Sequence, residues 1–256
     1  MHNIELNNKQ VLNVDNDSYV LRGDCDVVIN VNDNINAKIL LINSASNVTV
    51  NLGNYANVQF DTLVFESKKN KLVFNLSENA YLLLNYLSNL SSENDLEINL
   101  NGYKANALVK YLIVNKNNNS NFNAHINHNA KETTSDITNY GVSLGESRII
   151  FDTVGKINKG MAKSVCHQLT RGVINGDHAS VLSRPILLID EYDVKANHGT
   201  AIGRLSDREL YYLMSRGLTK EESYKLLLSG IANPIIESLW NDDVKEETHT
   251  NIYKEI

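Results

Sequence analysis

The chain has 256 residues, a formal net charge of −6 and a hydrophobic fraction of 42%. This length is sufficient for one or two domains with a sizeable core, and the acidic balance argues against a nucleic-acid-binding surface. No apolar run reaches the roughly 18 residues of a membrane helix, and the N-terminus shows no secretory signal. Two cysteines are too few for a disulfide framework. We therefore expect a soluble, cytoplasmic protein.

Short apolar or alternating runs, separated by Asn, Asp, Gly and Ser, fill the chain up to about residue 205. Alternation with a period of two predicts β-strands, and the polar residues between the runs predict turns. Several runs, including PILLI at 185–189, are apolar at consecutive positions, which favours strands buried on both faces. This pattern leaves a sandwich, a barrel or a solenoid open. The clearest predicted strands are Val27–Asn32, Asn47–Leu52, Asn57–Phe65, Lys71–Leu76 and Leu96–Gly102.

Helical signals replace the strand pattern after Leu205. Ser206–Glu209 and Thr219–Glu222 each have the S/T-x-x-E pattern of a capping box, which predicts a helix start at the first residue of each. Glycine is the usual residue just after a helix. Gly217 and Gly230 are therefore the predicted ends of these two helices.

The end of the chain is predicted to be a small helical module. A third short helix is expected over Pro234–Trp240, with proline at its first position, and the polar tail after it is expected to fray. The chain thus divides into a β-body over residues 1–205 and a C-terminal helical module over 206–256. Removal of everything after Gly203 is expected to leave a soluble β-body.

The segment RPILLIDEYDVKANHGTAIGRLSDRELYYLMSRG, residues 184–217, combines an apolar strand, a D-V-x-A-x-H-G segment, a G-x-L and a Y-L-x-x-R-G helix. This combination resembles the C-terminal signature of the SufB/SufD family of iron–sulfur cluster assembly proteins, and weaker similarity covers about residues 120–240. The resemblance implies a right-handed parallel β-helix with C-terminal helices. It also implies two partners, a SufC-type ATPase on the helical end and a SufB-like or identical second subunit. Typical members have a longer N-terminal region, so we expect a short form.

The residues around His198 distinguish the two branches of the family. SufB-like members usually have Glu after this histidine, whereas this chain has Gly199, the SufD-like choice. A cysteine of SufB-like members would fall at about Thr170, and one of SufD-like members at Ala196, so both thiols are missing here. The resemblance therefore implies a SufD-like scaffold that is not an enzyme. It implies no tightly bound cofactor, and only transient iron or iron–sulfur cluster within a complex.

His198 and Cys166 are the candidate ligands for iron or a cluster. A neutral imidazole suits iron, but one histidine cannot form a closed site, so a partner chain would supply further ligands. We expect His198 at a turn between strand and helix, where Gly199 allows a sharp bend. Cys166 fits better as a small buried hydrophobe. For His125 and His128, which form an H-x-x-H pair, a solvated loop is the favoured interpretation.

The predicted helices also carry candidate residues for binding a partner. Aromatic and arginine side chains are common anchors of protein interfaces, and packing beneath the helices is the alternative for the aromatic ones. For the arginine, stabilisation of a helix C-terminus is the alternative. The candidates are Tyr211, Tyr212, Arg216, Tyr224 and Trp240.

Other functional classes stay open beside the SufD-like scaffold. The chain could be the sole, SufB-like cluster-holding scaffold of a reduced system, although its missing cysteines argue against this. It could also be a β-helix carbohydrate-active enzyme, which would need paired carboxylates in a groove. A structural adhesin is disfavoured by the missing signal peptide and by the C-terminal helices. No nucleotide-binding motif is present, so any ATP dependence would come from the partner.

Overall fold

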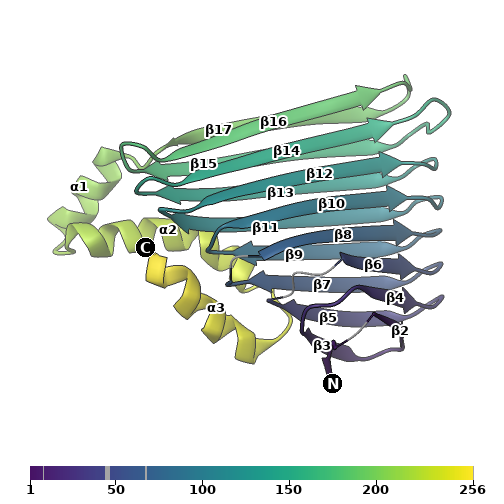
Figure 1. The fold of residues 1–256 in the computed structure, drawn as a ribbon. Coiled ribbons are helices and arrows are strands. Elements are labelled where there is room, and N and C mark those ends of the chain that lie inside the picture. The colour runs from purple at the N-terminus through teal and green to yellow at the C-terminus, as the bar shows by residue number, and fades with distance from the viewer. Residues whose placement is uncertain (8, 44–46, 67, 256) are drawn as a thin grey trace.

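The computed structural model describes residues 1–7, 9–43, 47–66 and 68–255. Within them, seventeen strands form two parallel sheets. Successive strands alternate between the two sheets, so each coil of the chain contributes one strand to each sheet. Figure 1 shows the resulting solenoid, with three helices along one side. The predicted parallel β-solenoid with C-terminal helices is confirmed, and the sandwich and the barrel are excluded.

The odd-numbered strands form sheet A and the even-numbered strands form sheet B. Sheet A comprises β1 (His2–Glu5), β3 (Ser18–Arg22), β5 (Asn36–Ile42), β7 (Asn57–Val64), β9 (Tyr81–Ser88), β11 (Asn106–Lys116), β13 (Thr134–Leu144), β15 (Val165–Asn175) and β17 (Lys195–Arg204). Sheet B comprises β2 (Gln10–Val14), β4 (Val27–Val31), β6 (Asn47–Leu52), β8 (Lys68–Leu76), β10 (Ser92–Leu100), β12 (Asn119–His128), β14 (Arg148–Ile157) and β16 (Ser180–Ile189).

The coils of the solenoid lengthen along the chain. Between β2 and β4 the in-register partners Asn13 and Asn30 are 17 residues apart, whereas Asp152 and Arg184 of β14 and β16 are 32 apart. The strands lengthen from 5 residues in β2 to 10 in β16. The molecule therefore tapers from a wide end at β16 and β17 to a narrow end at β1 and β2 (Figure 1).

An asparagine ladder runs along the outer face of sheet B. The side-chain amide of each asparagine donates a hydrogen bond to the carbonyl oxygen of the one in the preceding coil. Parallel strands stacked in register repeat one position in every coil, so a single residue type can bond along the whole sheet. Asparagine therefore occurs at strand positions in this chain as well as in turns. The ladder residues are Asn13, Asn30, Asn51, Asn75, Asn99 and Asn127.

The interior of the solenoid changes in character along its length. From the narrow end to β14 it is an apolar core in which aromatic rings such as Tyr86, Tyr111 and Phe122 lie 5.0–5.1 Å apart. Toward the wide end, buried polar side chains such as Asn139 and Thr170 enter the interior. The largest coils are therefore filled partly by hydrogen-bonded groups.

A second apolar core lies outside the solenoid, where helices cover the outer face of sheet A. It joins Leu87 of β9 and Leu112 of β11 to Leu228 and Ile252 of the helices. This explains the consecutive apolar positions of β9 and β11, which are buried on both faces as predicted. The same prediction is wrong for 185–189 in β16, because no element among the described residues covers the outer face of that strand. Removal of the helices would expose the second core, which argues against a soluble body truncated after Gly203.

The first two helices begin as predicted. Helix α1 (Asp207–Ser215) is capped by Ser206, and α2 (Lys220–Ile236) by Thr219, whose capping box is complete. Gly217 has a φ of 99°, a left-handed conformation that suits glycine, and it follows Arg216, the C-cap of α1.

The later helix boundaries differ from the prediction. Gly230 does not end α2, and Pro234 lies inside that helix near its end, so the separate helix predicted from Pro234 is wrong. The tail forms the helix α3 (Asp242–Glu255) instead of fraying, so that prediction is wrong. Buried Val244, Thr248 and Ile252 are spaced four residues apart and face sheet A.

The strands end at Arg204 and the helices begin at Asp207. This change of secondary structure lies at the proposed boundary, and the division into two domains stays a prediction. Within the described part of the chain, no helix is both long enough and apolar enough to cross a membrane.

Candidate functional site

The wide end of the solenoid is formed by β16 and β17, each of which lacks a strand partner on one edge within the described residues. His198 lies in the middle of β17, in register with Gln168 of β15. The expected turn at Gly199 is wrong, because parallel pairing with β15 continues over ten residues, from Lys195 to Arg204. A continuous ladder of this kind keeps the backbone extended through the glycine.

The side chain of His198 belongs to the inner face of the solenoid. Cys166, Gln168 and Thr170 alternate as buried residues along β15, which identifies the inward-facing positions of that strand. His198 is in register with one of them and therefore shares their face. In the part of the chain that the structure describes, no further coil covers β17, so the imidazole is exposed at the mouth of the solenoid. Within the described residues it makes no hydrogen bond, and its ring nitrogens are free for a ligand.

Cys166 lies one coil deeper than His198. Its partner in register is Ala196, two residues from the histidine, so the two side chains are diagonal neighbours roughly 8 Å apart. The thiol is fully buried. Burial raises its pKa, and a hydrogen bond with Ser135 partly opposes this effect. These surroundings fit the small buried hydrophobe, and a role of Cys166 in iron binding stays a prediction.

Polar groups beneath His198 escaped the sequence analysis. The Gln168 amide donates a 3.3 Å hydrogen bond to the Ile186 carbonyl, and its own carbonyl oxygen is buried without a partner among the described residues. Ser183 donates a 2.9 Å bond to Thr170. The alternation of apolar and polar residues along a strand assigns the polar ones to the outer face, so it cannot identify polar side chains that point inward. The mouth thus offers amide and hydroxyl groups beside one imidazole.

His125 and His128 lie on β12 rather than in a solvated loop, so that interpretation is wrong. Three positions apart on a strand, they point to opposite faces and cannot share a metal ion. His128 is buried between Thr133 and Ser135, with ring nitrogens 2.7 and 3.0 Å from the two hydroxyls. Burial lowers its pKa to about 4, so the ring is neutral at pH 7. Across the described part of the chain, no three His, Cys, Asp or Glu side chains cluster closely enough to hold a metal.

The surface of α1 and α2 carries three of the predicted partner-binding residues together. Tyr211 and Tyr212 are 75% and 55% exposed, and the Arg216 guanidinium lies 5.2 Å from the Tyr212 ring. An open groove of about 500 Å³ runs between the two helices. Its lining combines Ser206, Arg208, Glu209, Tyr212, Leu213, Leu226 and Leu227.

Tyr224 and Trp240 lie apart from this surface. Tyr224 lines a different pocket, on the side of α2 that faces the solenoid. Trp240 precedes α3, where its half-buried side chain packs against the second core. The structure therefore brings Tyr211, Tyr212 and Arg216 together but not the other two candidates.

The acidic residues near the wide end serve a turn. The Glu191 carboxylate accepts backbone hydrogen bonds from Gly160 at 2.8 Å, Tyr192 at 2.8 Å and Asp193 at 3.4 Å. These bonds lower its pKa. A carboxylate held in this way stabilises the turn, which argues against a role of Glu191 in a catalytic carboxylate pair.

Comparison with known proteins assigns the family. A family model described as the SufBD core domain of SUF system iron–sulfur cluster assembly matches residues 24–231, so the match begins well before residue 120, where the resemblance begins. SufD of Bacillus subtilis is 36% identical over 136 residues, which cover 53% of this chain and 31% of that protein.

Two further relatives are more distant. SufD of Escherichia coli is 25% identical over 107 residues, covering 42% of this chain and 25% of that protein. The chloroplastic protein ABCI7 of Arabidopsis thaliana is 28% identical over 111 residues, covering 43% and 23%. The matched region spans less than a third of the length of each of these relatives. The chain belongs to the SufB/SufD family of iron–sulfur cluster assembly proteins and is closer to SufD.

Proposed function

We propose that this chain is a SufD-like scaffold subunit of the SUF machinery. In this proposal it binds a SufC-type ATPase through α1 and α2 and pairs through its wide end with a SufB-like or identical subunit. The names of its relatives indicate an assembly component rather than an enzyme. The observation that carries the proposal is the wide end itself, where two long edge strands and an exposed histidine occur together.

The edge strands support pairing with a second subunit. An uncovered edge presents unpaired backbone N–H and C=O groups that can add another strand. The outer face of β16 adds apolar surface, with Ile186 and Leu188 46% and 51% exposed. Charge on that face comes from the Asp152–Arg184 ion pair and from Lys156, which is in register with Leu188. A partner strand beside β16 would cover these side chains.

The groove between α1 and α2 supports docking of the ATPase. Exposed aromatic residues with an adjacent arginine are typical anchors of protein interfaces. Tyr212 lines the groove and Leu226 forms its apolar wall. Both lie on helices whose first turns are stabilised by the capping residues Ser206 and Thr219.

Co-purification tests the docking step. The double variant Tyr211→Ala, Tyr212→Ala should bind a SufC-type ATPase at least tenfold more weakly than the unchanged chain. Tyr103→Ala is the control, because Tyr103 is also exposed but lies in the turn before β11, whereas α2 meets the other end of that strand, at Lys116. Equal binding by both variants would place the ATPase surface elsewhere.

Sedimentation tests the pairing step. Ile186→Asp combined with Leu188→Asp should abolish association with a SufB-like subunit or with a second copy. Val11→Asp is the control, because Val11 is also an exposed apolar residue but lies in β2 at the narrow end. If the control and the double variant associate equally well, the wide end is not the pairing surface.

His198 is proposed to act on iron or a cluster shared between two subunits. Its imidazole is exposed on the inner face of the last coil, where a partner could add ligands. One nitrogen is too little to hold iron alone. The isolated protein should accordingly bind iron weakly or not at all.

A further inference from the structure

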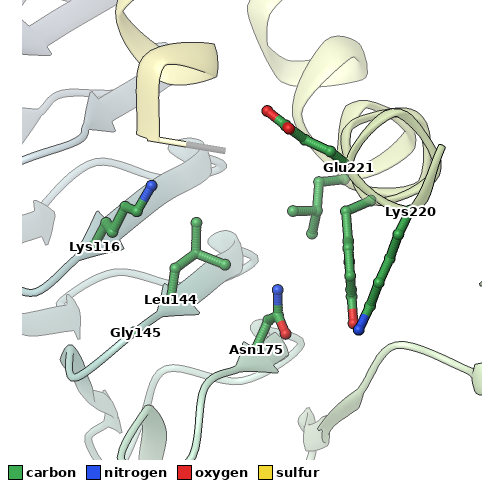
Figure 2. Close-up of a pocket in the computed structure, with 8 residues that line it drawn as sticks. Lys116, Leu144, Gly145, Asn175, Lys220 and Glu221 are labelled. Atoms are coloured by element: carbon green, nitrogen blue, oxygen red, sulfur yellow. The ribbon is translucent and has the colours of Figure 1, made fainter.

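A pocket of about 360 Å³ lies between α2 and the corners of three coils. The solenoid contributes the ends of β11 and β15 and the turn after β13, and α2 contributes its first turns and Leu228. The volume lies within the range of small-molecule sites. The lining residues are Lys116, Leu144, Gly145, Asn175, Lys220, Glu221, Tyr224 and Leu228 (Figure 2).

The pocket carries a net positive charge. Figure 2 shows Lys116 and Lys220 on opposite sides of it, with Leu144 and Asn175 between them. Neither lysine makes an ion pair with a carboxylate of the described residues, and the Lys220 amino group lies 5.8 Å from the Tyr224 ring. Glu221 is the acid of the lining, and its carboxylate pairs with Lys225 at 3.5 Å. Two ammonium groups therefore have no carboxylate partner at this pocket.

The start of α2 does not supply the attraction for an anion. Thr219 and Glu222 complete a capping box, with the Glu222 carboxylate 2.7 Å from the Thr219 backbone nitrogen. A carboxylate already occupies the helix N-terminus, so a second anion would depend on the lysines. The side-chain amide of Asn175 has no hydrogen bond among the described residues and is available as a donor.

The floor of the pocket is apolar. Leu144 and Leu228 are buried members of the second core, and the Tyr224 ring stands beside them. A hydrated inorganic ion would leave this apolar floor uncovered. An organic molecule with one anionic group would contact both the lysines and the floor. Burial of apolar area gives roughly 25 cal/mol per Å², so a few methylene groups would contribute substantially.

We propose that this pocket binds a small organic anion. Its carboxylate or phosphate lies between Lys116 and Lys220, within reach of the Asn175 amide, and its alkyl or aromatic body rests on Leu144 and Leu228. This site is separate from the groove between α1 and α2 and from the mouth of the solenoid. It adds a ligand-binding site to the protein and does not depend on the scaffold function.

Isothermal titration with four probes tests the proposal on the full chain. Hexyl phosphate or hexanoate should bind at least tenfold more tightly than hexanol and than inorganic phosphate, since only the first two satisfy both parts of the pocket. The tighter of the two identifies the anionic group. If hexanol binds as tightly as both organic anions, charge is not recognised and the proposal fails.

Variants then locate the site. Lys116→Met with Lys220→Met should weaken binding of the preferred probe at least tenfold, and Glu221→Gln should strengthen it several-fold by removing the one acid of the lining. Lys104→Met, at an exposed lysine outside the pocket, is the control and should leave affinity unchanged. The thermal midpoint of each variant should match that of the unchanged chain, because these side chains are exposed.

The groove between α1 and α2 is the competing location for an amphipathic probe. Arg208 lines that groove and is not among the residues that line the proposed pocket. Binding that survives Arg208→Met and is lost in the double lysine variant supports the proposal. Binding lost in Arg208→Met but retained in the double lysine variant would overturn it.

Discussion

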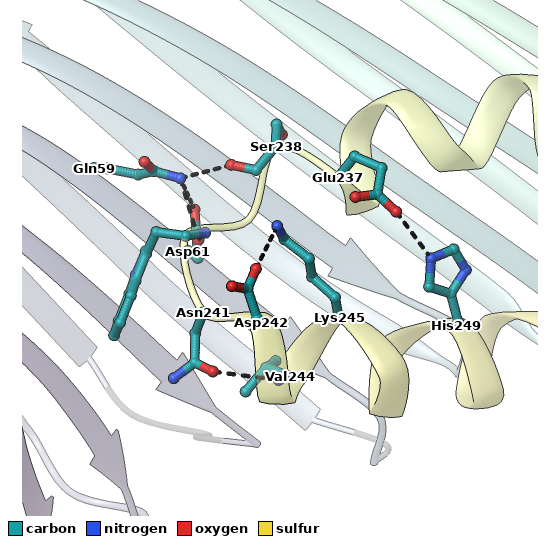
Figure 3. Close-up of polar contacts among 10 residues, drawn as sticks. Gln59, Asp61, Glu237, Ser238, Asn241, Asp242, Val244, Lys245 and His249 are labelled. Atoms are coloured by element: carbon teal, nitrogen blue, oxygen red, sulfur yellow. Dashed lines mark hydrogen bonds and ion pairs between the residues drawn. The ribbon is translucent and has the colours of Figure 1, made fainter.

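The backbone N–H of Trp240 donates a 3.0 Å hydrogen bond to the carboxylate of Asp61, which joins residues 179 positions apart. The carboxylate lies on the outer face of β7 and is fully buried. It also accepts bonds from Asn85 at 2.8 Å and from Gln59, whose amide bridges to the Ser238 carbonyl (Figure 3). One buried acid therefore fixes the connection between α2 and α3 to sheet A.

Replacement of Asp61 should loosen that connection. Asp61→Ala leaves the donors of Asn85 and Trp240 without an acceptor, whereas Gln59 keeps its bond to the Ser238 carbonyl. Each buried unpaired group costs about 1–3 kcal/mol. We expect the free energy of unfolding to fall by about 2 kcal/mol or more in urea titrations. Asp33→Ala is the control, because Asp33 also accepts bonds, from Asn54, but at an exposed turn. Equal losses in both variants would contradict a special role for the buried site.

The stability contribution of Asp61 should depend on pH. Burial is the main cause that raises its pKa from 3.8 to about 6, against the opposing hydrogen bonds. The folded state thus binds this proton more tightly than the unfolded chain does. The resulting stabilisation is full below about pH 4 and is lost as pH rises through about 6.

The stability contribution of buried His128 changes with pH in the opposite direction, over nearly the same pH range. Its pKa falls from 6.5 to about 4, so its contribution is full above pH 6.5 and is lost as pH falls through about 4. The two effects partly cancel in the unchanged chain. In Asp61→Asn only the loss at His128 remains, so acid should destabilise this variant more steeply.

Unfolding curves at pH 4, 5.5 and 7 measure the difference between the unchanged chain and Asp61→Asn. Two pKa units correspond to about 3 kcal/mol, which is the expected change in that difference between pH 7 and pH 4. Lys38 and Lys245 are the cations whose charges act on this site. A difference that is constant with pH would show that Asp61 does not titrate as described.

His198→Ala should separate function from stability. The side chain is exposed and makes no hydrogen bond among the described residues, so the free energy of unfolding should change by less than about 0.5 kcal/mol. In a complex with a cluster-bearing partner, the reconstituted cluster yield should fall several-fold. Asn197→Ala, one residue away on the opposite face of β17, should leave the yield unchanged. An unchanged yield in His198→Ala would remove the histidine from the mechanism.

Gly102 and Gly230 should respond to alanine with opposite signs. A Cβ at Gly102 would lie 2.0 Å from the backbone nitrogen of Glu78 in the preceding coil, so the coils must separate. We expect a loss of about 2 kcal/mol there, as in other overpacked sites. At Gly230, inside α2, a Cβ meets no atom within 4 Å, and alanine should stabilise the helix by about 1 kcal/mol. Thermal unfolding of both variants measures the two changes in stability. A loss of stability in Gly230→Ala would show that its helix is frayed.

The sequence predicts the coils well where strands have apolar inner positions. Asn47–Leu52 alternates strictly, and its strand has the predicted bounds. β17 was missed because KANHGTAIGR carries small and polar residues at an end with no further coil above it. A strand in that place has little to bury, so its sequence lacks the usual alternation.

Long-range contacts account for the other differences. α3 looks like a polar tail because only one narrow stripe of it, including Val244 and Ile252, meets sheet A. The burial of Asp61 depends on α2 and α3, which are far from it in sequence. The position of His198 depends on the register between β15 and β17. Local patterns do not contain these relationships, whereas the capping residues Ser206 and Thr219 act locally and were correctly identified.

The taper of the solenoid limits how copies can assemble. Head-to-tail stacking would place the four-residue strand β1 of one copy against the ten-residue strand β17 of the next, leaving more than half of the longer edge uncovered. Repetition of that contact would build an open filament. Contact between two wide ends matches strand lengths and uses the same surface on both molecules, so it closes after two subunits. The growth in coil length therefore disfavours head-to-tail stacking between these two ends and favours contact between two wide ends.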